Sequence, residues 1–118
     1  MTRDEHLVKA RRIVASLEKL SLESDAMCVI DGAVIAGYHL GNALLHRHGV
    51  LPDVEHANTP SKLPVAPAQL PTAIQPAFAA FTELERLRLE HVRSPGACDA
   101  TLAKRAWQLL DDIRHAAS

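Results

Sequence analysis

The chain has 118 residues, of which 13 are basic and 14 acidic, and its formal net charge at pH 7 is −1. This length suits one domain with a modest core and is too short for two, so residues 1–118 are predicted to form a single domain. The near-zero net charge excludes a broad electrostatic attraction to nucleic acid or to an anionic membrane.

The N-terminal sequence and the cysteines favour a cytoplasmic location. The segment MTRDEHLVKARR is charged and lacks the apolar region of a signal peptide. Cys28 and Cys98 have neither the spacing of a close disulfide pair nor that of a metal-ligand pair, so both are expected to be reduced thiols. The chain has seven histidines, which could make it clearly cationic in mild acid, because an unperturbed imidazole has a pKa near ~6.5.

The first helix is predicted over residues 3–20. The segment TRDE offers Thr2 as the N-cap and Glu5 as its reciprocal partner in a capping box. Apolar side chains recur at helical spacing and form one stripe, which consists of Leu7, Ala10, Val14 and Leu17.

The second helix is predicted over residues 24–48, and Gly49 provides a left-handed stop after it. Its apolar run at 26–45 approaches the ~20 residues of a membrane span. Asp31, His39 and Asn42 are costly in hydrocarbon, and aromatic anchors are missing at both ends, so no membrane span is predicted. Small residues along this helix would let neighbouring helices approach closely, as expected of the central helix of a bundle.

A polar stripe interrupts the second helix, since four polar residues fall within about 80° of one another on a helical wheel. These residues, which Tyr38 borders, are Asp31, His39, Asn42 and His46. The stripe can line a cleft or a dimer interface, or it can be the solvent-facing side of the helix. A metal bound by His39 and His46, with Asp31 or His56, is disfavoured because seven helical residues separate the two histidines by about 10 Å along the axis. No metal and no other cofactor is therefore predicted.

A proline-rich connection occupies residues 50–75, with prolines at 52, 60, 64, 67 and 71. It exceeds the usual bundle connection of about 2–8 residues, so it is either a functional arm or lid or a loosely ordered excursion. We expect it to add little to the core beyond Leu63, Val65 or Leu70.

Two further helices are predicted at 76–93 and 100–116. Pro76 suits the first turn of the third helix, which should break at SPG. Asp99 is a good N-cap for the fourth. The chain is therefore predicted to be an all-α, up-down four-helix bundle with one long loop between the second and third helices.

Two segments resemble HEPN domains, a family of small prokaryotic helical bundles. GAVIAGYHLGNALLHRHGVLPDVEH is similar to the second helix of that family, with its aromatic residue, ALL segment and glycine-ended turn. LERLRLEHVRSPGACDATLAKRAWQLLDDIRHA resembles its closing helical pair and carries the family's motif of Arg, four residues and His, as Arg86 and His91.

The resemblance implies a homodimer and offers two functions. Many HEPN proteins are metal-independent ribonucleases, often toxins, in which this Arg and His meet at a dimer cleft. His91 would then be the acid/base acting on single-stranded RNA, and Arg86 would stabilise the charge on the phosphate. The alternative is a non-enzymatic interaction or small-ligand-binding module, with RNA, a nucleotide or an antitoxin-type protein as partner.

Two observations weigh on the catalytic assignment. On an unbroken helix Arg86 and His91 point about 140° apart, so a helix end or a second subunit has to bring them together. The family tends to have a polar residue directly after the Arg, whereas this chain has Leu87. Arg86 is also explained as a surface partner of Glu83 or Glu90, and His91 as a residue of the apolar stripe near the helix C-terminus. Few aromatic residues and little net charge favour the non-enzymatic module.

Overall fold

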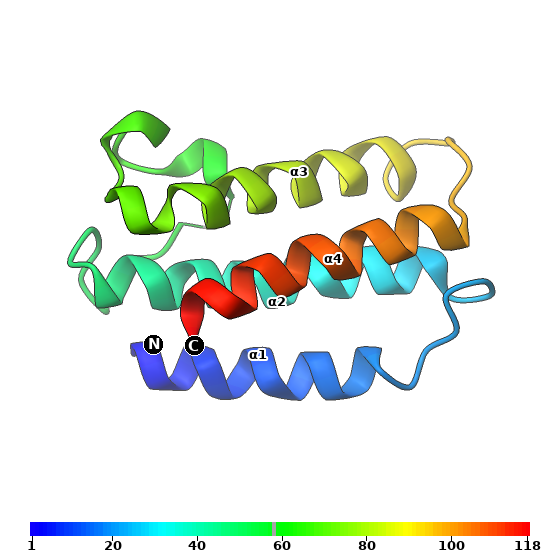
Figure 1. The fold of residues 1–118 in the computed structure, drawn as a ribbon, viewed down its shortest axis with the longest axis horizontal. Helices are drawn as coiled ribbons and strands as arrows, with labels where there is room; N and C mark the ends of the chain where they lie inside the picture. The colour runs from blue at the N-terminus through cyan, green and yellow to red at the C-terminus, as the bar shows by residue number, and fades with distance from the viewer. Residues whose placement is uncertain (58) are drawn as a thin grey trace.

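The computed structural model describes residues 1–57 and 59–118 (Figure 1). Within these residues the chain forms four α-helices, three short 3-10 helices and no strand, which confirms the predicted all-α class. The α-helices are α1 (Arg3–Leu17), α2 (Ala26–Arg47), α3 (Gln75–His91) and α4 (Ala100–Ala117). The 3-10 helices, all in the connection between α2 and α3, are η1 (Pro60–Lys62), η2 (Pro67–Gln69) and η3 (Thr72–Ile74).

Local signals at the helix ends act as predicted. The backbone N–H of Thr2 donates to Glu5 Oε2 at 2.7 Å, and the N–H of Glu5 donates to Thr2 Oγ1 at 3.3 Å, which completes the capping box. Asp99 Oδ1 accepts the N–H of Leu102 at 3.0 Å at the start of α4. After α2, Gly49 has φ 70°, a left-handed conformation that glycine adopts without a steric penalty.

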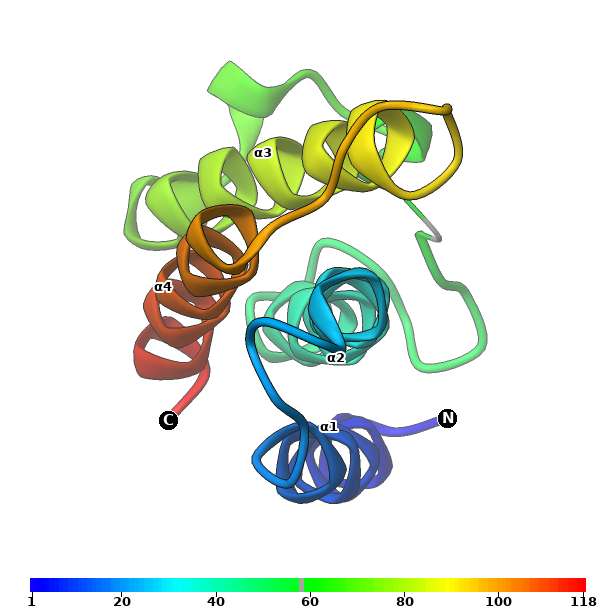
Figure 2. The same ribbon diagram turned by 90° about the vertical axis from the view of Figure 1, so that its right-hand side faces the viewer.

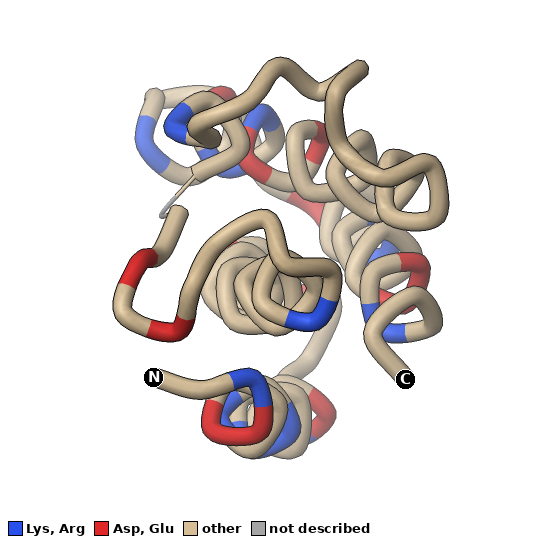
Figure 3. The backbone as a smooth tube through the Cα atoms, turned by 90° about the vertical axis from the view of Figure 1, so that its left-hand side faces the viewer, with Lys and Arg blue, Asp and Glu red and all other residues tan. Residues whose placement is uncertain are grey.

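Helix α2 is the centre of the molecule, with α1 on one side and α3 and α4 on the other (Figure 2). It is long and apolar enough to cross a membrane by composition, but 67% of its most apolar 18-residue window is buried inside the bundle. Charged residues lie mainly on the outer helices, where basic and acidic positions are interspersed (Figure 3). The apolar composition of α2 is therefore explained by its central position.

Small residues of α2 lie where other side chains come close. A Cβ atom at Gly37 would lie 3.4 Å from the ring of Phe81, and one at Gly41 would lie 3.5 Å from the same ring. A Cβ atom at Gly32 would collide with the side chain of Leu17. The predicted close helix approaches thus occur on two sides of α2, toward α3 and toward the end of α1.

The connection at residues 50–75 contributes more to the core than predicted. Leu63 and Val65 are only half-buried. Leu70 is buried as predicted, and three further residues of this segment are buried in the main core, namely Leu51, Ala57 and Ile74. The prolines prevent a long helix here, but the three 3-10 turns that form instead lie against α3 and bring apolar side chains into the core.

Candidate metal centre

The buried stripe of α1 begins at His6, one position earlier than predicted. His6, Ala10, Val14 and Leu17 are the buried residues of this helix, whereas Leu7 is only partly buried. These residues are four, four and three positions apart, which is helical spacing. His6 therefore lies on the same face of the helix as the apolar residues that follow it. Because His6 is 1% exposed and α1 packs on α2, its imidazole lies against the central helix.

His46 lies in the last turn of α2, and the chain reversal after Gly49 fixes the orientation of its ring. Nδ1 of His46 lies 3.0 Å from the carbonyl oxygen of Leu51. A carbonyl oxygen only accepts, so Nδ1 carries the proton and Nε2 keeps its lone pair. The exposed carboxylate of Asp53 lies 4.0 Å from the same Nδ1. The side chain of His46 is 2% exposed.

His56 comes from the connection after α2, and the side chain of Asn42 holds the residue that follows it. Asn42 Nδ2 donates to the carbonyl oxygen of Ala57 at 3.0 Å, and Asn42 Oδ1 accepts the N–H of Ala57 at 2.9 Å. Nε2 of His56 lies 3.3 Å from the carbonyl oxygen of Met1 and can donate to it when it carries the proton. Asn42 thereby positions His56 from a buried site on α2.

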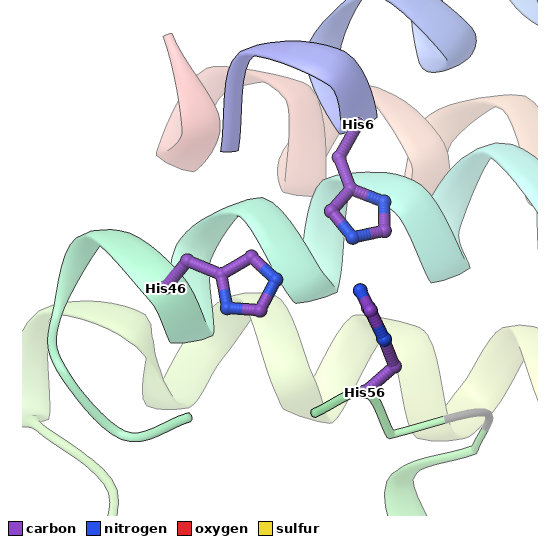
Figure 4. Close-up of side chains that lie close together, drawn as sticks. All are labelled: His6, His46 and His56. Atoms are coloured by element: carbon purple, nitrogen blue, oxygen red, sulfur yellow. The ribbon is translucent and has the colours of Figure 1, made fainter. Parts of the chain in front are cut away.

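The three imidazoles converge although they come from α1, α2 and the connection (Figure 4). Their ring centroids form a nearly equilateral triangle, with sides of 5.3 Å for His6 and His46, 5.0 Å for His6 and His56, and 5.4 Å for His46 and His56. One ring nitrogen from each residue lies within 4.8 Å of the other two.

Two buried nitrogens of this triangle, Nε2 of His6 and Nε2 of His46, have no hydrogen bond to any residue that the structure describes. A buried polar atom left unpaired costs about 1–3 kcal/mol, so such atoms are rare unless something else satisfies them. An ion that accepts both lone pairs would satisfy them together.

The three ligand nitrogens would have to move closer together to bind a tetrahedral transition-metal ion. Bonds of about 2.0–2.1 Å to a Zn²⁺ ion place tetrahedral ligand nitrogens about 3.3 Å apart. The ligand nitrogens lie within 4.8 Å of one another, so their separations would have to shorten by up to about 1.5 Å. Three imidazoles and no carboxylate suit Zn²⁺ and its neighbours better than Ca²⁺ or Mg²⁺, which prefer oxygen ligands. The fourth coordination position would be open to water or to an external ligand.

Burial favours the neutral form of two imidazoles at the contact between α1 and α2, those of His6 and His39. Burial, followed by the neighbouring imidazoles of His39, His56 and His46, lowers the pKa of His6 to about 4. Burial also lowers the pKa of His39, with smaller effects from Lys9 and His56. His6 is therefore neutral at pH 7, the protonation state in which an imidazole binds a metal ion.

The ring of His6 lies between His39 and His46, which are two turns apart on α2. Its centroid is 5.2 Å from that of His39 and 5.3 Å from that of His46. Nδ1 of His6 lies 2.9 Å from Nδ1 of His39. His39 and His46 are two turns apart on α2 and are too distant to bind one ion together, as predicted. The cluster instead combines His46 with His56 and with His6, which was not predicted as a ligand.

The remaining residues of the polar stripe have separate surroundings. Asp31 Oδ1 forms an ion pair at 3.0 Å with Nε of Arg88 on α3, although this nitrogen makes no hydrogen bond among the described residues. The rings of Tyr38 and His39 pack in a T-shaped arrangement, with centroids 4.9 Å apart. Asn42 is 1% exposed and the side chain of His46 is 2% exposed, so the solvent-facing explanation of the stripe is wrong for these two residues.

Arg86 and His91 are not brought together within one chain. Helix α3 continues through both residues, so their side chains leave it about 140° apart. Arg86 is exposed on the wall of a shallow groove that also contains Arg93. His91 Nδ1 lies 3.0 Å from the carbonyl oxygen of Ala97 and donates to it, which fastens the turn before α4.

Comparisons with protein-family models, with curated proteins and with solved structures find no match for this chain.

Proposed function

We propose that this chain is a metal-binding helical bundle that holds a transition-metal ion such as Zn²⁺ through His6, His46 and His56. The observation that carries the proposal is the pair of buried Nε2 atoms on His6 and His46, which have no partner among the described residues and converge with a third imidazole. Each of these nitrogens offers a lone pair to the same small volume.

A cluster of imidazoles without an ion is a poor way to stabilise a bundle. Apolar side chains at these positions would bury the same surface without leaving polar atoms unpaired. Neighbouring imidazoles also oppose one another's protonation, which contributes to the low pKa of His6. Metal coordination would turn both costs into a favourable interaction, because it needs neutral ligands with free lone pairs.

The proposed ion would fasten the edge of the bundle. Helix α1 packs mainly on α2, and the segment around His56 is held chiefly through Asn42 and Ala57. Coordination would link α1, α2 and this segment at one point. With three protein ligands the ion would keep one position for water or a small external ligand, which supports a small-ligand-binding module better than a purely structural four-ligand site.

The finer predictions from the sequence remain proposals. They are the up-down, HEPN-like class of the bundle, a homodimer, an antitoxin-type protein partner and a cytoplasmic location. The non-enzymatic ligand-binding alternative agrees with the metal proposal, since a metal ion is itself a small ligand. The ribonuclease alternative uses Arg86 and His91, which lie on α3, a helix that supplies none of the three proposed ligands.

Metal titration of the purified, metal-stripped chain tests the proposal. We expect calorimetry to detect one Zn²⁺ ion per chain, and Co²⁺ to give the intense visible absorption of a tetrahedral site. His46→Ala should abolish both signals. His48→Ala is the matched control, because His48 is exposed directly after α2 and does not belong to the cluster. Absence of saturable binding, or equal loss in both variants, would overturn the proposal.

A further inference from the structure

His39 contacts the proposed ligand His6 through its Nδ1 atom and lies outside the set of three ligands. We infer that His39 is a positioning residue, which accepts a hydrogen bond from Nδ1–H of His6 and thereby directs the lone pair of Nε2 toward the ion. This inference rests on the proposed function, but the tautomer of His6 is a property of the metal-free chain.

The 2.9 Å separation of the two Nδ1 atoms allows only two arrangements of neutral rings. If His6 donates, its proton is on Nδ1 and its Nε2 is free to bind a metal. If His39 donates, the proton of His6 moves to Nε2, which then cannot be a ligand. The direction of this hydrogen bond therefore decides whether Nε2 of His6 can bind a metal ion.

Burial favours the arrangement in which His6 donates. Nε2 of His6 is buried with no partner in the described part of the chain. A proton on that atom would be a buried N–H donor without an acceptor, a situation that folded proteins almost always avoid. In the favoured arrangement His39 carries its proton on Nε2 instead. Because His39 is only half-buried, water can accept from it.

The same pattern holds for His46. Its Nδ1–H donates to the carbonyl oxygen of Leu51, which leaves the lone pair of Nε2 free. Such outer contacts fix the tautomer and the ring orientation of metal-binding histidines. The hydrogen-bond partner of His6 is a side chain, whereas that of His46 is a backbone carbonyl, so a substitution can remove the partner of His6.

Two variants of His39 separate acceptor chemistry from packing. His39→Phe keeps an aromatic ring and removes the acceptor, whereas His39→Gln removes the ring and keeps an oxygen that can accept. Tyr38→Phe is the matched control, because it removes only a hydroxyl group from the ring that packs against His39.

Long-range proton–nitrogen NMR of the metal-free protein reports the His6 tautomer. We expect the proton on Nδ1 in the parent and in His39→Gln, and a mixture or a shift to Nε2 in His39→Phe. Zn²⁺ affinity should fall about 10–100-fold in His39→Phe and stay within a few-fold of the parent in His39→Gln and Tyr38→Phe.

The two proposals fail in different ways. If the parent binds no Zn²⁺, the proposed function is wrong, while the NMR experiment still decides the role of His39. If the parent binds Zn²⁺ and His39→Phe changes neither the tautomer nor the affinity, His39 is not a positioning residue. Equal affinity losses in His39→Phe and His39→Gln would also overturn the inference, because the acceptor would then not be the cause.

Discussion

Asn42 of α2 brackets the backbone of Ala57, donating to its carbonyl oxygen at 3.0 Å and accepting its N–H at 2.9 Å. Asn42 and Ala57 are both buried. Because Ala57 lies outside any helix, these two hydrogen bonds satisfy backbone groups that a helix would otherwise pair. The amide also donates to the carbonyl oxygen of Tyr38 at 2.9 Å. One polar residue of the central helix thus fixes a segment 15 positions further along the chain.

We expect Asn42→Leu to lower the free energy of unfolding by about 2–4 kcal/mol, because it leaves the N–H and C=O of Ala57 buried without partners. Urea denaturation followed by circular dichroism measures the loss. Gln69→Ala is the control, since Gln69 makes a comparable bond to the N–H of Ala66 at an exposed position and should cost less than about 1 kcal/mol. Equal losses in the two variants would mean that the hydrogen bonds between Asn42 and Ala57 are not important for stability.

Removal of the metal should destabilise the protein if the proposed site exists. An ion present at 100 times its dissociation constant adds about 2.7 kcal/mol to the free energy of unfolding. A chelator added to the loaded protein should therefore lower its Tm and speed hydrogen exchange in the first turns of α1. His48→Ala should respond like the parent, and His46→Ala should not respond. A Tm that is indifferent to chelator in the loaded parent would contradict this prediction.

Mild acid should destabilise the metal-free chain through His6. The pKa of His6 is about 4 in the folded state, below the unperturbed value of 6.5. Between these two pH values His6 is mostly protonated in the unfolded chain and mostly neutral in the folded chain. The free energy of unfolding should fall as the pH drops from 6.5 to 4, by at most about 3 kcal/mol from this group. The lowered pKa of His39 acts in the same direction. Below pH 4 the contribution of His6 should level off.

His6→Gln provides the comparison for this pH dependence. Glutamine does not titrate, so the variant should show a flatter slope of stability against pH between 6.5 and 4, measured by urea denaturation at each pH. An unchanged slope would show that other groups cause the acid sensitivity.

Gly41 tests the close packing of α2 against α3. A Cβ atom there would lie 3.5 Å from the ring of Phe81 and 3.6 Å from that of Phe78, which is ordinary contact. Gly41→Ala should therefore be tolerated and gains helix propensity, whereas Gly41→Leu should overpack this contact and cost about 1–3 kcal/mol. Thermal denaturation distinguishes them. If Gly41→Leu melts like the parent, this face of α2 is not tightly packed.

The helices could be predicted from the sequence because their ends are marked locally. Thr2 with Glu5, Gly49, Pro76 and Asp99 each act within a few residues, so no knowledge of the tertiary structure is needed. Leu51, Ala57 and Ile74 of the 50–75 connection could not be predicted in this way, because its prolines hide the helical periodicity that normally reveals apolar faces.

The histidine cluster depends on the fold. His6, His46 and His56 belong to three segments, and no spacing along the chain relates them. One signal was present in the sequence: the series His6, Ala10, Val14 and Leu17 has helical spacing and places a histidine on the inward face of the first helix. Assigning the start of that stripe to Leu7 concealed it. The tautomers likewise depend on carbonyl groups from distant segments.

The pair Arg86 and His91 distinguishes the two functional classes predicted from the sequence. We expect the purified protein to leave single-stranded RNA intact in the presence of a chelator, because a single chain keeps these side chains about 140° apart on one helix. His91→Ala should cost about 1 kcal/mol of stability, since His91 donates to the carbonyl oxygen of Ala97. Gel electrophoresis of labelled RNA and thermal denaturation measure the two effects.

The ribonuclease alternative gives a different pattern in the same experiment. It requires cutting that survives the chelator, that His91→Ala and Arg86→Ala abolish, and that a dimer carries out. Arg88 is unsuitable as the control because it pairs with Asp31 at 3.0 Å, and its loss would disturb the contact between α2 and α3. Arg93→Ala is better, because Arg93 is exposed and shares the groove of Arg86. Equal loss of cutting in Arg86→Ala and Arg93→Ala would indicate general electrostatic binding of RNA, whereas loss in Arg86→Ala alone would identify the specific pair.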